Sequence, residues 1–155
     1  MDKMIRENMK AIISVVILTC MVPSIILGSI GASAMQQKEK IAICNKSINI
    51  SLPLWLVIEN IGSFVAASLL IAAIVASVNH KQGYLKIIGI LLLLLGLFQV
   101  AWLVVGAMDV IKADEECRSE MPVIYWIVVA SIIVAVLSVV YSFVHPKLMS
   151  STKTK

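Results

Sequence analysis

The sequence predicts an all-α fold, a four-helix transmembrane bundle with short loops, and three observations support this. The chain has 155 residues, 60% of them hydrophobic, and its mean hydropathy is +0.99. Charged residues make up only 14% and lie mostly between or beyond four long apolar runs. Each run is near the roughly 20 residues that a membrane-spanning helix needs. We therefore expect a single membrane domain over residues 1–155, without a separate soluble domain.

The first span is expected at about residues 11–34. Pro23 should kink this helix, because it removes one backbone hydrogen bond and crowds the preceding turn. Small residues on one face, where another helix can approach closely, are Ser24, Gly28 and Ala32. A different interpretation stays open. The basic start and Ala32-Ser33-Ala34 resemble a signal peptide with its cleavage site, so the segment could be removed.

The other three spans are expected at about residues 52–78, 87–110 and 123–144. The second and fourth open at Pro53 and Pro122, where a missing N–H costs little. Trp55, Tyr125 and Trp126 fit the membrane–water interface. The third span has one face that carries Gly89, Gly96, Gln99, Leu103 and Gly106. The small face of the fourth span carries Ser131, Ala135, Ser138 and Ser142.

The distribution of positive charge favours a cytoplasmic location for both termini. In that orientation eight Lys and Arg residues are cytoplasmic: Lys3, Arg6, Lys10, Lys81, Lys86, Lys147, Lys153 and Lys155. The outer loops then hold five: Lys38, Lys40, Lys46, Lys112 and Arg118. An excess on the cytoplasmic side is the usual rule.

The same orientation places two loop cysteines, Cys44 and Cys117, on the oxidising side of the membrane. We expect a disulfide between them that ties spans one and two to spans three and four, and two free thiols are the competing expectation. Cys20 lies within the first span and is expected to be a buried, small apolar residue. The first outer loop also has two N-x-S sequons, so Asn45 and Asn49 are possible glycosylation sites. Both lie close to the second span, and an unmodified asparagine is the competing expectation.

Several short motifs recur in a known pattern: a cysteine shortly before Pro53-Leu54-Trp55-Leu56-Val57, then Trp102-x-x-x-Gly106, Cys117, and Tyr125 at the start of the fourth span. In these motifs the chain resembles the transmembrane protein 272-like family of small four-span proteins. The resemblance covers roughly residues 26–142. The chain departs from the family pattern around Cys44, where Ile43 and Asn45 replace the usual acid and proline. The resemblance implies four spans and a Cys44–Cys117 link, and it supplies no catalytic residues.

Signals for an enzyme are weak, and we expect no catalytic residue, cofactor or metal. His80 and His145 both lie at the cytoplasmic ends of predicted spans. The spacing of the cysteines fits no zinc pattern. The acidic loop with Asp114, Glu115, Glu116 and Glu120 could attract cations weakly, but a solvated loop is the commoner meaning.

Glu59 is the feature of the sequence that calls most for an explanation. It lies seven residues inside the second span, about 10 Å deep at 1.5 Å per residue, with Asn60 beside it. Small residues follow it at helical spacing, so we expect it to face protein: Gly62, Ser63, Ala66, Ala67, Ala73 and Ser77.

The matching level of the other spans falls near Gly28 and Ser29, Trp102 and Leu103, and Ala130 and Ser131. No Lys, Arg or His is among them, so Glu59 should be hydrogen-bonded by Ser29, Ser131 or backbone, be protonated, or face water. Gln99 is expected to bond between helices.

Three roles are compatible with Glu59. It could be a packing residue, it could line the pore of a homo-oligomeric cation-permeable channel, or it could dock a partner's transmembrane helix. The sequence best fits a non-enzymatic assembly or accessory subunit, with the channel as the alternative. Expected partners are membrane lipid and a second copy or another membrane protein, and no nucleic acid. The expected location is the plasma membrane or a secretory-pathway membrane.

Overall fold

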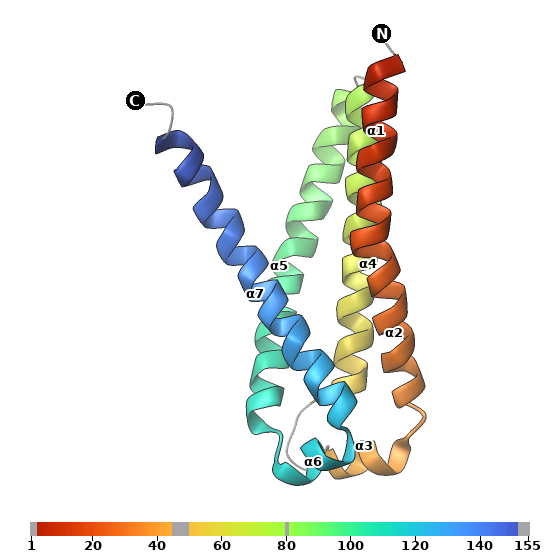
Figure 1. Ribbon diagram of the computed structural model, residues 1–155, viewed down its shortest axis with the longest axis vertical. Coiled ribbons are helices and arrows are strands. Elements are labelled where there is room, and N and C mark those ends of the chain that lie inside the picture. The colour runs from red at the N-terminus through yellow and green to blue at the C-terminus, as the bar shows by residue number, and fades with distance from the viewer. Residues whose placement is uncertain (1–2, 45–49, 80, 152–155) are drawn as a thin grey trace.

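The structure, a computed structural model, describes residues 3–44, 50–79 and 81–151 and is almost wholly helical there (Figure 1). The elements are α1 (Lys3–Val16), the π-helical segment η1 (Ile17–Met21), α2 (Val22–Ala34), α3 (Lys38–Cys44), α4 (Leu52–Val78), α5 (Gln82–Lys112), α6 (Glu115–Glu120) and α7 (Pro122–Ser151). The predicted all-α class is confirmed for these residues.

Three helical segments are long and apolar enough to cross a membrane: Glu7–Ala34, Leu52–Val78 and Gln82–Lys112. The apolar part of α7 among the described side chains, Pro122–Ser138, is shorter. Large apolar side chains along these helices are exposed, as a lipid environment allows. The protein is therefore an integral multi-pass membrane protein, and the crossing by a fourth span stays a prediction.

The helices form an up-and-down bundle that is closed at one end and open at the other (Figure 1). The short helices α3 and α6 cap the closed end. From there α7 starts beside α4 and α5 and then diverges from them. The start of α1 and the end of α7 both lie toward the open end. This arrangement agrees with the expected placement of both termini on one side of the membrane, although the side itself remains a prediction.

Pro23 disturbs the first helix in a specific way. It has no N–H for the carbonyl of Thr19, and the turn before it widens into η1, where the backbone N–H of Val22 bonds to the oxygen of Ile17. Two hydroxyls add bonds here: Thr19 Oγ1 donates to Val15 O and Ser24 Oγ to Cys20 O, each at 2.7 Å. The irregularity expected at Pro23 is thus a π-bulge.

The buried core lies at the closed end, around Trp55. Trp55, Leu56 and Val128 have essentially no exposed surface. The indole Nε1 of Trp55 donates to Trp102 O at 2.9 Å, and Trp102 Nε1 donates back to Trp55 O at 3.3 Å. Gly106 lies directly under the Trp55 ring, where a Cβ would overlap it. Trp55 therefore joins α4 to α5 inside the bundle, and its depth near the membrane–water interface stays a prediction.

Two of the expected small-residue faces are only partly correct. In α2, Ala32 is exposed, whereas Gly31 is buried. A Cβ added at Gly31 would lie 3.0 Å from Cγ2 of Val57 on α4. The contacting face therefore follows a step of four and then three residues, as the helical period requires. In α5, Gly106 packs tightly, but a Cβ added at Gly89 or Gly96 would meet no neighbouring element within 4 Å. They lie in the half of α5 from which α7 has diverged.

Candidate functional site: an intramembrane groove

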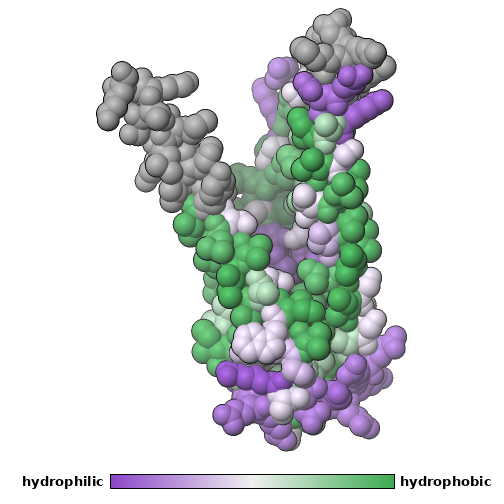
Figure 2. Space-filling view, viewed as in Figure 1, coloured by the Kyte–Doolittle hydropathy of each residue, from purple (hydrophilic) through white to green (hydrophobic). Residues whose placement is uncertain are grey.

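The divergence of α7 opens a groove of about 820 Å³ between α7 and the other spans. On α7, Val128 near the closed end is 0% exposed, whereas Ser131 and Ala135, which follow it on the same face, are only partly buried. Figure 2 shows a hydrophilic area deep in the opening between α7 and the rest of the bundle, bordered by apolar surface. We call this space the intramembrane groove.

The wall of the intramembrane groove is made mainly of small side chains. More than half of the lining residues are Ala, Ser, Thr or Cys: Thr19, Cys20, Ser24, Ser63, Ala66, Ala67, Ala130, Ser131, Ala135 and Ser138. Small and hydroxyl-bearing residues are the ones that let a transmembrane helix approach closely and hydrogen-bond across the contact. The π-bulge before Pro23 contributes Thr19 and Cys20 to this wall, so the irregular turn faces the groove.

Glu59 and Gln99 form the polar centre of the groove. With the amide oriented by its neighbours, Gln99 Nε2 donates to Glu59 Oε2 at 3.0 Å and Gln99 Oε1 accepts from Ser63 N at 3.2 Å. Glu59 is half-buried. The α5 residue that meets Glu59 is Gln99, one turn away from Trp102 and Leu103, which were predicted at this level. Trp102 is instead engaged with Trp55, and the long Gln99 side chain reaches Glu59.

Gly62 is what allows this arrangement. A Cβ there would lie less than 3 Å from the Gln99 amide, so glycine leaves room for the amide in this position against α4. Asn60 has a different role. It is buried, its Nδ2 donates to Leu56 O at 2.7 Å, and its Cβ lies 3.5 Å from the position that a Cβ on Gly28 would take. Asn60 thus supports the contact between α4 and α2, and it also lines the groove.

The hydrogen-bond partners expected for Glu59 were partly wrong. Ser29 bonds to its own helix, through Oγ to Ile25 O at 2.7 Å, and does not line the groove. Ser131 does line it. Among the described residues, Gln99 donates a hydrogen bond to the Glu59 side chain. Among the residues whose side chains the structure describes, those that line the groove include no Lys, Arg or His.

The closed end is fastened by a disulfide and by an acid that the sequence alone did not single out. Cys44 and Cys117 are bonded, which joins α3 to α6. Asp109 is 1% exposed, and its Oδ2 accepts from the backbone N of Ile50 at 3.3 Å. Asp109 follows Trp102 and Gly106 at helical spacing, and this repeat was the signal that could have revealed it.

The remaining candidate residues lie elsewhere. Asn45, Asn49 and His80 lie outside the described residues, as do the side chains of Ser142 and His145. Asp114 caps α6, where its side chain accepts from Cys117 N at 2.9 Å. Glu115, Glu116 and Glu120 are exposed. Cys20 is a free, exposed thiol at the groove wall, whereas the sequence suggested a buried residue.

Comparisons with protein-family models, curated proteins and solved structures find no match to this chain. The resemblance seen in the sequence is therefore supported only at the coarser level of a small multi-span membrane protein. Any statement about function depends on the geometry of the intramembrane groove.

Proposed function

We propose that this protein is a non-enzymatic assembly or accessory subunit, which receives one transmembrane helix of another membrane protein in its intramembrane groove. The observation that carries the proposal is the Glu59 carboxylate in the wall of a groove made of small side chains. A helix needs such a surface to approach closely. An intramembrane acid is costly unless it faces protein or water and finds a partner.

Charge complementarity points to the kind of helix that would bind. The described lining of the groove supplies a carboxylate and no basic side chain. A guest helix with one Lys or Arg near mid-membrane would match it, and Gln99 would hold the carboxylate in place. A second copy of this chain fits poorly, because residues 11–34, 52–78, 87–110 and 123–144 contain no Lys, Arg or His. The proposed partner is therefore a different protein.

Co-purification of the tagged full-length protein from its native membranes tests the proposal. The decisive comparison is Ala66→Trp, which fills the groove, against Ala72→Trp on the exposed side of the same helix. The partner should be lost with Ala66→Trp and with Glu59→Gln, and retained with Ala72→Trp. Its transmembrane helix should carry a basic residue whose replacement by Leu also abolishes capture. Equal capture by all of these variants would refute the proposal.

A homo-oligomeric cation-permeable channel is the second candidate, and Glu59 in an open groove beside Ser63 and Ser131 favours it. Acidic side chains lining a pore select cations. Purified protein in planar bilayers should then carry a cation current that Glu59→Gln abolishes or alters. A protein that is folded, as its intact disulfide would show, and that passes no current at any pH would eliminate this candidate.

A further inference from the structure

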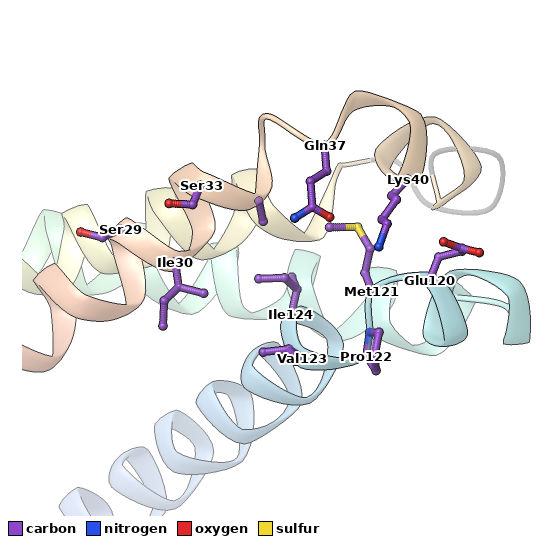
Figure 3. A pocket seen from close by; sticks show the side chains of 11 residues that line it. Ser29, Ile30, Ser33, Gln37, Lys40, Glu120, Met121, Pro122, Val123 and Ile124 are labelled. Atoms are coloured by element: carbon purple, nitrogen blue, oxygen red, sulfur yellow. The ribbon is translucent and has the colours of Figure 1, made fainter.

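A second groove, of about 580 Å³, lies at the closed end of the bundle, between the end of α2 and the start of α7 (Figure 3). We call it the interfacial groove. One wall comes from Ile30 and Ser33 of α2, and the facing wall from Val123 and Ile124 of α7. Lys40 of α3 and Glu120 of α6 lie at its outer edge. This groove is separate from the intramembrane groove, so a ligand bound in it would be independent of the proposed partner helix.

The interfacial groove changes from apolar to charged along its length. Its inner part is formed by Ile30, Val123 and Ile124, which belong to predicted spans. Its outer part is formed by Gln37, Lys40 and Glu120 in the capping segments. Figure 2 shows the same division on the surface, with a hydrophilic cap below an apolar body.

Aromatic residues fix this level as the membrane–water interface. Trp126 is 66% exposed one turn into α7 and packs edge-on against Tyr125, with ring centroids 5.5 Å apart. Arg118 lies over the Tyr125 ring, 5.2 Å from its centroid. Exposed Trp with neighbouring Tyr and Arg is typical of the headgroup region. The charged end of the groove is therefore at headgroup depth, and the apolar end extends toward the acyl chains.

The two charges at the outer edge have opposite signs and come from different helices. Among the described residues, neither Lys40 nor Glu120 lies within 4.0 Å of an oppositely charged group. Both side chains are exposed, so each can reach a ligand. A zwitterion matches such a pair, because its anion can bind the ammonium of Lys40 while its cation binds the Glu120 carboxylate. A headgroup with net negative charge would be attracted by Lys40 but repelled by Glu120.

We propose that the interfacial groove binds one zwitterionic glycerophospholipid of the bilayer. The phosphate lies at Lys40, the amine or choline at Glu120, and one acyl chain between Ile30 and Ile124. A lipid in this position would cover apolar surface of α2 and α7 where they separate.

Native mass spectrometry of the full-length protein, titrated with phosphatidylcholine or phosphatidylglycerol, tests this proposal. The wild type should retain one phosphatidylcholine in preference to phosphatidylglycerol. Lys40→Gln should weaken its retention by roughly two- to fivefold, the usual effect of an exposed charge pair. Glu120→Gln should shift the preference toward phosphatidylglycerol. Lys38→Gln and Glu116→Gln, which carry the same charges on the same helices but do not line this groove, should leave both lipids unaffected.

A filling variant provides the second test. Ser33→Trp should displace the bound phosphatidylcholine. Ala32→Trp should not, because Ala32 is exposed but does not line the groove. An intact disulfide in each variant shows that the closed end has folded. Three results would overturn the proposal: equal lipid retention by all variants, a wild-type preference for phosphatidylglycerol, or a lipid-free dimer that dissociates with Ser33→Trp. The last result would mean that a second copy occupies the groove.

Discussion

Trp55 and Trp102 each donate an indole hydrogen bond to the backbone carbonyl of the other, at 2.9 and 3.3 Å. The two residues belong to antiparallel helices, α4 and α5, and their reciprocal bonds set the register between these helices. That register places Gln99, one turn inward from Trp102, beside Glu59. The polar centre of the intramembrane groove therefore depends on a contact at the closed end.

Replacing either indole by phenyl should weaken the bundle. Trp55→Phe removes a donor from a fully buried site and should lower the free energy of unfolding by about 0.6–2 kcal/mol, the range found for interhelical hydrogen bonds in membranes. Unfolding in mixed micelles measures this change. Trp126→Phe is the control, because Trp126 is 66% exposed and should contribute little. Equal effects of the two variants would show that the reciprocal bonds contribute nothing.

A methyl group on Gly106 should be much worse than one on Gly96. The Cβ of Gly106→Ala would overlap the Trp55 ring, whereas that of Gly96→Ala would meet nothing within 4 Å. Overpacking of this kind costs about 1–3 kcal/mol. Thermal unfolding in detergent should separate the two variants of the same helix. If Gly96→Ala were as destabilising as Gly106→Ala, the close packing of α5 against Trp55 of α4 would be wrong.

The disulfide should appear as a redox-dependent shift in gel mobility. Cys44→Ser and Cys117→Ser should each abolish the difference between reduced and oxidised protein, because these two cysteines are bonded. Cys20→Ser should retain it, since Cys20 is a free thiol. Mass spectrometry of a non-reduced digest identifies the linked peptides. Linkage of Cys20 to either partner would contradict the structure.

Asp109 should protect the segment that leads into α4. Its carboxylate accepts from the Ile50 amide at 3.3 Å from a fully buried position. Asp109→Leu removes the acceptor, so hydrogen exchange at Ile50 should accelerate by roughly tenfold or more, given about 1.5–3 kcal/mol for a bond to a charged group. Asp109→Asn keeps an oxygen in place and should have a smaller effect. Unchanged exchange in Asp109→Leu would mean that other contacts hold the segment.

The sequence was sufficient to predict the long apolar helices, but not the short helices α3 and α6 or the space between the spans. Apolar run lengths and the two helix-initiating prolines placed the start of α4 at Leu52 and that of α7 at Pro122. The distribution of positive charge set the orientation, which put the two loop cysteines on the same, oxidising side and so predicted the Cys44–Cys117 bond. These features are local, or depend only on which side of the membrane a loop occupies.

The candidate site was predicted less completely, for a physical reason. The depth of Glu59 and its face on α4 could be counted from the sequence, but the rotation of α5 and the divergence of α7 could not. The rotation of α5 brought Gln99 to Glu59, while Ser29 on α2 bonds within its own helix. Together, the rotation and the divergence also left Gly89 and Gly96 without neighbours. Asp109 was overlooked because it lies at the end of an apolar run, where an acid is unremarkable by composition alone.

The most direct test of the proposed helix-binding role is the binding of a transmembrane peptide to the reconstituted full-length protein. The probes are two leucine–alanine helices that differ only at one central residue, Lys or Leu, and energy transfer in vesicles from the dye-labelled protein reports binding. The Lys peptide should bind the wild type roughly 5- to 30-fold more tightly, as expected from about 1–2 kcal/mol for an intramembrane polar contact. Glu59→Gln should remove this preference. Equal binding of the two peptides to the wild type, or an unchanged preference in Glu59→Gln, would contradict the proposed role.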